Sequence, residues 1–90
     1  MEPAVAVLHV DDDQQFAETT ARFLEHQDDR LRVTTVHRPD DAVEKLQTGG
    51  YDCVVSDFDM PGQTGLDLLD RVREFDPDLP FILFTGKGSE

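Results

Sequence analysis

The 90-residue sequence contains one cysteine, two lysines and no tryptophan. A single cysteine excludes an intramolecular disulfide bond and favours a cytoplasmic protein. Cys53 lies in an apolar run, where a buried thiol is more common than a nucleophile. No apolar run approaches the roughly 18 residues that predict a membrane-spanning helix, and the amino-terminal residues do not resemble a signal peptide. We therefore expect no association with a membrane.

Basic residues are also scarce. The sequence has 8 Lys and Arg and 20 Asp and Glu, which gives a net charge of -12. This balance argues against direct binding to nucleic acid or to anionic membrane surfaces, since both need a basic protein surface. Cationic or metal-bearing partners fit it better. The excess of acidic residues over lysine also resembles the composition of proteins from salt-loving archaea. Ninety residues suffice for one small domain.

Apolar runs alternate with amphipathic segments along the chain. The apolar runs predict strands over residues 4–10, 31–36, 51–56 and 81–84. Helical periodicity predicts helices over residues 14–27 and 39–48 and a third that opens at Thr64 or Gly65. In the third helix, Leu66, Leu69 and Val72 are expected to face the sheet, and Asp13 is placed to cap the first helix. The alternation predicts an α/β fold, a doubly wound parallel sheet with helices on both faces.

Polar side chains follow three of these strands: Asp11 and Asp12 follow the first, Asp57 the third and Thr85 the fourth. Right-handed winding outward from the first strand places the first and third strands side by side, so their acidic ends meet. Carboxylates that converge repel one another unless a cation neutralises them. Mg²⁺ suits such a site and is commonly bound together with phosphate oxygens. We therefore predict that Asp57 acts as a nucleophile toward phosphorus beside Mg²⁺, with Thr85 donating a hydrogen bond to a phosphoryl oxygen.

Three stretches resemble the receiver domain of two-component response regulators. They are Val-Leu-His-Val-Asp-Asp-Asp at 7–13, Val-Val-Ser-Asp-Phe-Asp-Met-Pro-Gly-Gln-Thr-Gly at 54–65 and Phe-Ile-Leu-Phe-Thr-Gly at 81–86. The resemblance implies a flavodoxin-like (CheY-like) fold with strand order 2-1-3-4, and a signalling domain rather than an enzyme. It implies that Asp57 accepts a phosphoryl group from a histidine kinase and that Thr85 is the switch hydroxyl. It also implies that Asp11, Asp12, Asp57 and the main-chain carbonyl of Asp59 surround Mg²⁺.

Receiver domains continue beyond the fourth strand through a helix, a fifth strand and a last helix. The fifth strand carries a lysine that pairs with the phosphoryl group. We therefore expect one receiver domain over residues 1–90 that is incomplete at its carboxyl terminus. The exposed edge of the fourth strand would then favour a homodimer or completion by another chain.

Two other functions remain open at this point. The segment from Val54 to Asp59 also resembles the first motif of haloacid-dehalogenase-type phosphatases, with Asp57 as the nucleophile and Asp59 as the general acid. That family usually has its nucleophile strand first and needs a later acidic pair, and it leaves Asp11 and Asp12 unexplained. The third reading is an interaction module that keeps the fold and metal site but is not phosphorylated. Among the histidines, His9 is expected in the core, and His26 and His37 at the surface.

Overall fold

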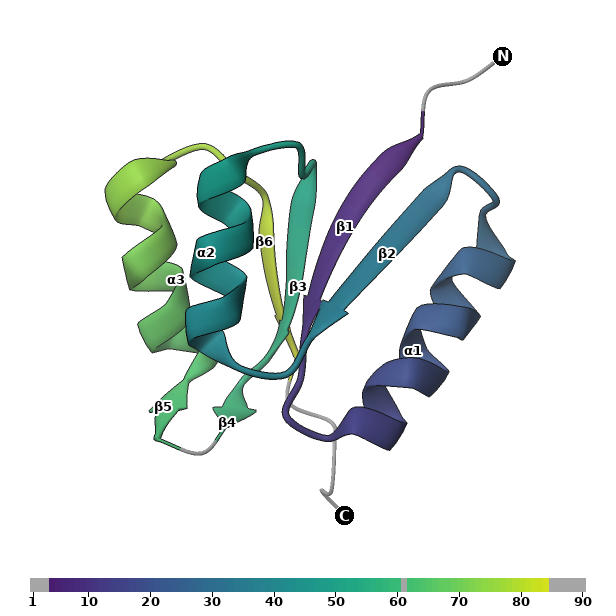
Figure 1. Cartoon of the computed structure of the whole chain (residues 1–90), viewed down its shortest axis with the longest axis horizontal. Coiled ribbons are helices and arrows are strands. Elements are labelled where there is room, and N and C mark those ends of the chain that lie inside the picture. The colour runs from purple at the N-terminus through teal and green to yellow at the C-terminus, as the bar shows by residue number, and fades with distance from the viewer. Residues whose placement is uncertain (1–3, 61, 85–90) are drawn as a thin grey trace.

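The computed structural model describes residues 4–60 and 62–84 (Figure 1). The elements follow one another in the order β1 (Val5–Val10), α1 (Gln14–Gln27), β2 (Leu31–Val36), α2 (Pro39–Thr48), β3 (Cys53–Asp57), β4 (Asp59–Met60), β5 (Gln63–Thr64), α3 (Gly65–Phe75) and β6 (Phe81–Phe84). All the predicted strands and helices are present. None of the helices in residues 4–60 and 62–84 has both the length and the apolar character of a membrane-spanning segment.

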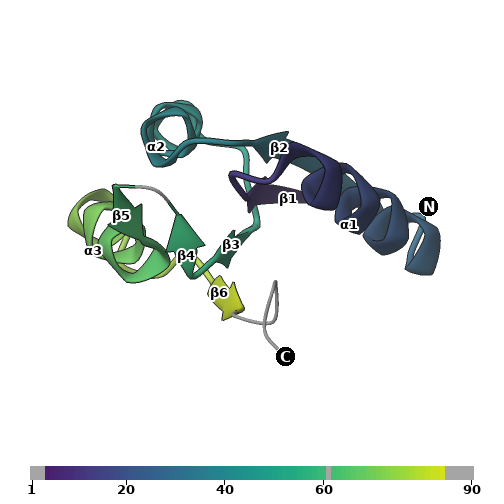
Figure 2. The ribbon, with the colours of Figure 1, turned by 90° about the horizontal axis from the view of Figure 1, so that it is seen from below.

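Four of the strands form one parallel sheet in the order β2-β1-β3-β6. This is the predicted order 2-1-3-4, because β6 is the fourth of the predicted strands. Val10 is in register with Val36 on one side and with Ser56 on the other, so β1, β2 and β3 end at nearly the same level. Figure 2 looks onto the edge where the parallel strands end. The residues that follow them are therefore neighbours in space.

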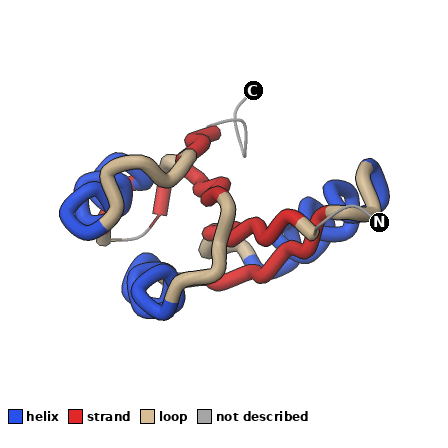
Figure 3. The backbone as a smooth tube through the Cα atoms, turned by 90° about the horizontal axis from the view of Figure 1, so that it is seen from above, coloured by secondary structure: helices blue, strands red, loops and turns tan. Residues whose placement is uncertain are grey.

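Helices α2 and α3 cover one face of the sheet and α1 lies on the other (Figures 2 and 3). The main hydrophobic core fills the space between the sheet and the pair α2 and α3, and consists of Leu8, Val10, Val36, Ala42, Leu46, Val54, Met60, Leu68, Val72 and Leu79. Successive side chains of a strand point to opposite faces of the sheet, so every second residue faces this core. In β1 these residues are Leu8 and Val10, and both are apolar.

The buried stripe of α3 differs from the predicted one. Leu68 and Val72 are fully buried, whereas Leu66 is 48% exposed, so the expectation that Leu66 faces the sheet is wrong. The physical reason is the position of Gly65, which is itself buried and sets the first contact of α3 with the sheet. From that contact the helical repeat brings Leu68 and Val72, three and seven residues on, to the same face.

The face that carries α1 is packed less completely. His9 is fully buried there and its ring stacks on that of Phe84, with the ring centroids 6.0 Å apart. Phe16 of α1 also contacts Phe84, at 6.3 Å between centroids. The prediction of a core histidine at position 9 is confirmed. Two large apolar side chains, Phe23 and Ile82, remain 60% and 54% exposed.

A short antiparallel hairpin formed by β4 and β5 was not predicted. Asp59 pairs with Thr64, and Met60 with Gln63. Gly62 lies between them at a φ of 84°, a conformation that glycine adopts without steric cost. Strands of two residues are too short to show an alternating pattern, so no periodicity in the sequence indicates this hairpin. The hairpin lies beyond the end of β3, at the same edge as the acidic residues (Figure 1).

Candidate functional site

An acidic cluster lies at the edge where the parallel strands end. Asp11, Asp12 and Asp57 each present a carboxylate oxygen, and these oxygens lie within 4.8 Å of one another. Asp11 and Asp57 are buried, with 0% and 1% of their surface exposed, whereas Asp12 is exposed. The structure thus brings together three of the predicted metal ligands, which come from two different strand ends.

Two predicted site residues remain outside this cluster. Asp59 is exposed in β4, and its carboxylate does not belong to the group of oxygens that converge among the described residues. Its predicted contribution is the main-chain oxygen, and that stays a prediction. Thr85 lies outside the residues that the structure describes, so its role as the switch hydroxyl also stays a prediction.

Hydrogen bonds to the main chain position Asp11. Its N–H donates to the carbonyl of Val36 on β2 at 3.1 Å, which continues the parallel pairing by one residue. Its carboxylate Oδ1 accepts the N–H of Asp13 at 2.9 Å, closing a turn typical of aspartate. Asp13 in turn caps α1, because its Oδ1 accepts the N–H of Phe16 at 3.0 Å, as predicted. The chain therefore turns sharply after β1 and holds one carboxylate at the edge.

Asp57 is the last residue of β3 and is held by the elements on both sides of it. Beyond it, the N–H of Phe58 donates to the carbonyl of Phe84 at 2.9 Å, and the carbonyl of Phe58 accepts the N–H of Gly65 at 2.7 Å. The Ser56 hydroxyl donates to the main-chain oxygen of Asp57 at 3.0 Å. These contacts fix the backbone that carries the Asp57 carboxylate.

Gly65 is a site residue that sequence reasoning missed, because it was considered only as the start of a helix. A Cβ atom at this position would lie 2.7 Å from the main-chain oxygen of Asp57 and would collide with the side chain of Leu83. Only glycine lets the first turn of α3 approach β3 so closely. The sequence signal that could have revealed it is a glycine placed inside the amphipathic pattern, where a core residue would be expected.

The cluster fits a hard divalent cation. Carboxylate oxygens are the ligands that Mg²⁺ prefers, and Mg²⁺ usually takes one or two carboxylates, keeps several waters and binds phosphate oxygens as well. Three carboxylates this close together would otherwise repel one another by about 1 kcal/mol per pair in water and by more near a protein surface. The donor set therefore suits Mg²⁺ with space left for a phosphoryl group.

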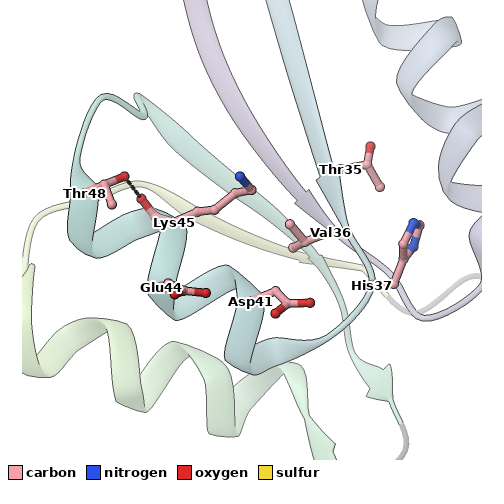
Figure 4. Close-up of a pocket in the computed structure, with 7 residues that line it drawn as sticks. All are labelled: Thr35, Val36, His37, Asp41, Glu44, Lys45 and Thr48. Atoms are coloured by element: carbon pink, nitrogen blue, oxygen red, sulfur yellow. Dashed lines mark hydrogen bonds between the residues drawn. The ribbon is translucent and has the colours of Figure 1, made fainter.

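Two cavities lie near the ends of β1 and β2. The larger has a volume of about 550 Å³ and is lined by Thr35, Val36, His37, Asp41, Glu44, Lys45 and Thr48 (Figure 4). The smaller has a volume of about 390 Å³ and is lined by Asp12, His37, Arg38, Pro39, Asp40, Met60 and Gln63. Only the smaller one includes a member of the acidic cluster, so it is the cavity that adjoins the candidate site.

Comparison with known proteins identifies the family. The sequence profile of the response regulator receiver domain matches residues 7–90. The chain belongs to this family. It is 34% identical over 88 residues to the C4-dicarboxylate transport transcriptional regulatory protein DctD of Rhizobium meliloti, covering 98% of this chain and 19% of DctD. It also matches the uncharacterized transcriptional regulatory protein YkoG of Bacillus subtilis, with 32% identity over 83 residues, covering 92% of this chain and 36% of YkoG.

Solved structures agree with this assignment. The response regulator TrrA of Thermotoga maritima, in complex with Mg²⁺-BeF, is similar with a TM-score of 0.84 and 28% identity over 93% of this chain and 71% of TrrA. TrrA in complex with the histidine kinase ThkA gives a TM-score of 0.82 with 28% identity, covering 96% of this chain and 75% of TrrA. The predicted family and the flavodoxin-like receiver fold are thereby confirmed. This receiver domain spans 36% or less of the length of DctD and of YkoG.

Proposed function

We propose that this receiver domain accepts a phosphoryl group on Asp57 and passes the signal of a two-component system. The observation that carries the proposal is the meeting of a buried Asp57 with Asp11 and Asp12 within 4.8 Å at the carboxyl edge of the sheet. A carboxylate that attacks phosphorus needs neighbouring ligands for a cation, because the cation neutralises the negative charge of the phosphoryl group. Asp11 and Asp12 are such neighbours. The receiver family is a family of signalling domains, and we propose that this member is not an enzyme in its own right.

The Asp57 carboxylate has the main role in the proposed reaction. One of its oxygens attacks phosphorus in line with the leaving group, so that a new P–O bond forms as the bond between phosphorus and the donor breaks. For a phosphohistidine donor that bond is P–N, and the imidazole that leaves keeps the electron pair and takes up a proton. The product is an acyl phosphate on Asp57.

Asp11, Asp12 and the main-chain oxygen of Asp59 are proposed to hold Mg²⁺ beside Asp57. When bound, Mg²⁺ neutralises the charge on the phosphoryl oxygens during transfer. Asp11 is buried and fixed by the turn that follows β1, which suits a ligand whose position must not change. Asp12 is exposed and can bind the metal directly or through water. Thr85, as the proposed switch hydroxyl, would donate a hydrogen bond to a phosphoryl oxygen.

The proposed donor is a histidine kinase in the cytoplasm. The structure of the similar protein TrrA with the histidine kinase ThkA supports this choice of partner, and that of TrrA with Mg²⁺-BeF supports the choice of metal. The net charge of -12 supports the absence of direct contact with nucleic acid or membrane. The single cysteine supports the cytoplasmic location.

Association through the apolar side of β6 is a further part of the proposal. Ile82 on this strand is 54% exposed, and Phe23 on the same side of the sheet is 60% exposed. Exposed apolar side chains of this size favour contact with a second copy or with another chain. Sedimentation of the wild type and of Ile82→Asp over a range of concentrations tests association with a second copy, and a wild type that stays monomeric at every concentration would contradict the homodimer.

The phosphoacceptor function is tested by intact mass. The protein is incubated with acetyl phosphate and Mg²⁺ beside Asp57→Asn and Asp70→Asn, the latter a matched control on the exposed side of α3. We expect a labile gain of one phosphoryl group in the wild type and in Asp70→Asn, and none in Asp57→Asn. Labelling of Asp57→Asn at the rate of the wild type would reject Asp57 as the acceptor.

The variant Asp59→Asn separates the receiver from the phosphatase alternative. For a receiver, Asp59→Asn is expected to change only the lifetime of the phosphorylated state. For a phosphatase, Asp59 is the general acid, so phosphomonoester turnover would be present in the wild type and lost in Asp59→Asn. The family match and the presence of Asp11 and Asp12 in the site both favour the receiver. A folded wild type that binds Mg²⁺ but is never labelled would favour the interaction module.

A further inference from the structure

Arg38 lies beside the acidic cluster, in the loop between β2 and α2. It lines the cavity of about 390 Å³ together with Asp12, a member of the cluster. Met60 and Gln63 of the β4–β5 hairpin line the same cavity. The cavity is therefore lined by an arginine, by a proposed metal ligand and by the hairpin that follows Asp57.

The guanidinium of Arg38 has no partner among the described residues, unlike most arginines of this chain. Arg30 pairs with Asp28 at 2.7 Å, and Arg71 pairs with Asp40 at 2.9 Å. The second of these pairs matters here, because Asp40 lines the same cavity and its charge is already balanced by Arg71. The side chain of Arg38 makes no hydrogen bond or ion pair with the described residues, so its charge remains available to a ligand in the cavity.

The backbone at Arg38 is held in place on both sides. Before it, Nδ1 of His37 lies 3.0 Å from the main-chain oxygen of Asp11 and donates a hydrogen bond to it. After it, the carbonyl of Arg38 accepts the N–H of Ala42 at 3.1 Å, in the first turn of α2. The side chain of Arg38 thus starts from a fixed point close to the acidic cluster.

We propose that Arg38 is a positioning residue that attracts and orients the anionic phosphodonor as it approaches Asp57. This inference rests on the proposed function. A phosphodonor carries negative charge and must approach three carboxylates in a chain of net charge -12, which repel it. A guanidinium presents two parallel N–H groups that match the spacing of phosphate oxygens. Among the described residues, Arg38 is the positively charged side chain that lines a cavity together with Asp12 of the cluster. It is therefore placed to offset this repulsion.

The same charge has an opposite effect on the metal. A cation beside Asp12 repels Mg²⁺ and weakens its binding, while it favours the phosphodonor. Loss of Arg38 should therefore tighten Mg²⁺ binding and slow phosphorylation at the same time. A merely structural role would not produce this pair of opposite changes, because a distorted site would bind Mg²⁺ more weakly and would also be phosphorylated more slowly.

The first measurement is the rate of labelling by acetyl phosphate at saturating Mg²⁺, over a range of donor concentrations. Arg38→Ala is expected to lower the second-order rate constant by about tenfold, the loss typical of one charge-assisted contact, chiefly by raising the half-saturating donor concentration. Arg38→Lys should recover part of the rate, because it keeps the charge that attracts the donor but not the paired N–H groups that orient it. The matched control is Arg32→Ala, which removes the same charge near the start of β2, at the opposite end of the sheet, and should change the rate by less than about twofold.

The second measurement is the affinity for Mg²⁺ alone, by titration calorimetry of the same variants. We expect the dissociation constant of Arg38→Ala to fall by about two- to fivefold relative to the wild type and Arg32→Ala to leave it unchanged. A rate for Arg38→Ala within twofold of that for Arg32→Ala, or weaker Mg²⁺ binding in Arg38→Ala, would overturn the inference alone. A wild type that is not labelled, or an Asp57→Asn variant labelled as fast, would overturn the proposed function and this role with it.

Discussion

The imidazole Nδ1 of His37 lies 3.0 Å from the main-chain oxygen of Asp11 and donates a hydrogen bond to it. The register of the sheet explains this contact, because Val10 and Val36 are paired and the next residue of each strand comes to the same level. The bond ties the loop after β2 to the turn after β1, where Asp11 and Asp12 sit. His37, expected at the surface, is half-buried and has a structural role.

Loss of this bond should loosen the acidic turn. His37→Ala is expected to lower the free energy of unfolding by about 1 kcal/mol, the usual net value of a hydrogen bond, and to weaken Mg²⁺ binding because Asp11 and Asp12 lose a fixed support. Urea denaturation and Mg²⁺ titration measure the two effects. His26→Ala, at an exposed position near the end of α1, is the matched control and should change neither. Equal effects of the two variants would contradict this role for His37.

The close approach of Gly65 to Asp57 gives a second prediction. In Gly65→Ala the new Cβ would lie 2.7 Å from the main-chain oxygen of Asp57, so either α3 or the end of β3 must move. We expect a loss of stability of about 1–3 kcal/mol, which is typical of overpacking, together with slower phosphorylation of Asp57. Urea denaturation and intact mass measure these two changes.

Leu66→Ala is the control for this substitution, since it lies one residue further along α3 and is 48% exposed. It should cost less than about 1 kcal/mol and leave the labelling rate unchanged. If Gly65→Ala is as stable and as readily labelled as Leu66→Ala, the close contact with Asp57 is not needed for the site.

The side-by-side position of the first and third strands, and with it the meeting of Asp11, Asp12 and Asp57, could be predicted from the sequence for a physical reason, whereas the full strand order came from the family resemblance. Continuous apolar runs that end in acidic residues show both where a buried parallel strand lies and where it stops. Right-handed winding outward from the first strand in both directions then makes the ends of the first and third strands neighbours. Neither step depends on the detailed packing of side chains.

What could not be predicted depends on contacts between segments far apart in the chain. The burial of Leu68 instead of Leu66 follows from the contact of Gly65 with Asp57 and Leu83, which no local pattern encodes. The hydrogen bond of His37 to Asp11 depends on the register of two strands. The position of Arg38 beside Asp12 depends on where α2 begins relative to the hairpin, and an isolated arginine in a loop carries no signal of its own.

The salt bridge between Arg30 and Asp28 leads to a prediction about pH. Side-chain hydrogen bonds from Arg30, and after them its backbone N–H, lower the pKa of Asp28 from 3.8 to about 2. Because the pKa is lower in the folded state, the stabilisation is present above the unfolded pKa of 3.8 and is lost as the pH falls through about 2. The pair is exposed to solvent, so added salt should reduce the effect.

The variant Arg30→Gln tests this linkage. It should raise the pKa of Asp28 toward its ordinary value, as followed by the ¹³C shift of the Asp28 carboxyl carbon in the folded protein. Arg32→Gln is the control, because Arg32 donates to the main-chain oxygens of Asp29 and Leu31 rather than to Asp28. An unchanged Asp28 titration in Arg30→Gln would show that the hydrogen bonds from Arg30 do not lower its pKa.

The acidic cluster should make the stability of the fold depend on Mg²⁺. Three carboxylates within 4.8 Å repel one another, and a ligand that binds only the folded state adds RT ln(1 + [L]/Kd) to the free energy of unfolding, or about 2.7 kcal/mol at one hundred times Kd. We expect the melting temperature of the wild type to rise with Mg²⁺ and to fall again when the metal is removed by a chelator.

Asp12→Asn separates repulsion from metal binding, because Asp12 is the exposed member of the cluster and its replacement leaves the hydrogen bond from Asp13 to the Asp11 carboxylate in place. Without Mg²⁺ this variant should be at least as stable as the wild type, since one of three like charges is gone. With Mg²⁺ it should gain less than the wild type, since a ligand is missing, whereas the surface control Asp70→Asn should gain as much. If thermal denaturation shows equal gains for Asp12→Asn and the wild type, Asp12 is not a ligand, and the metal must be held by Asp11, Asp57 and main-chain oxygens alone.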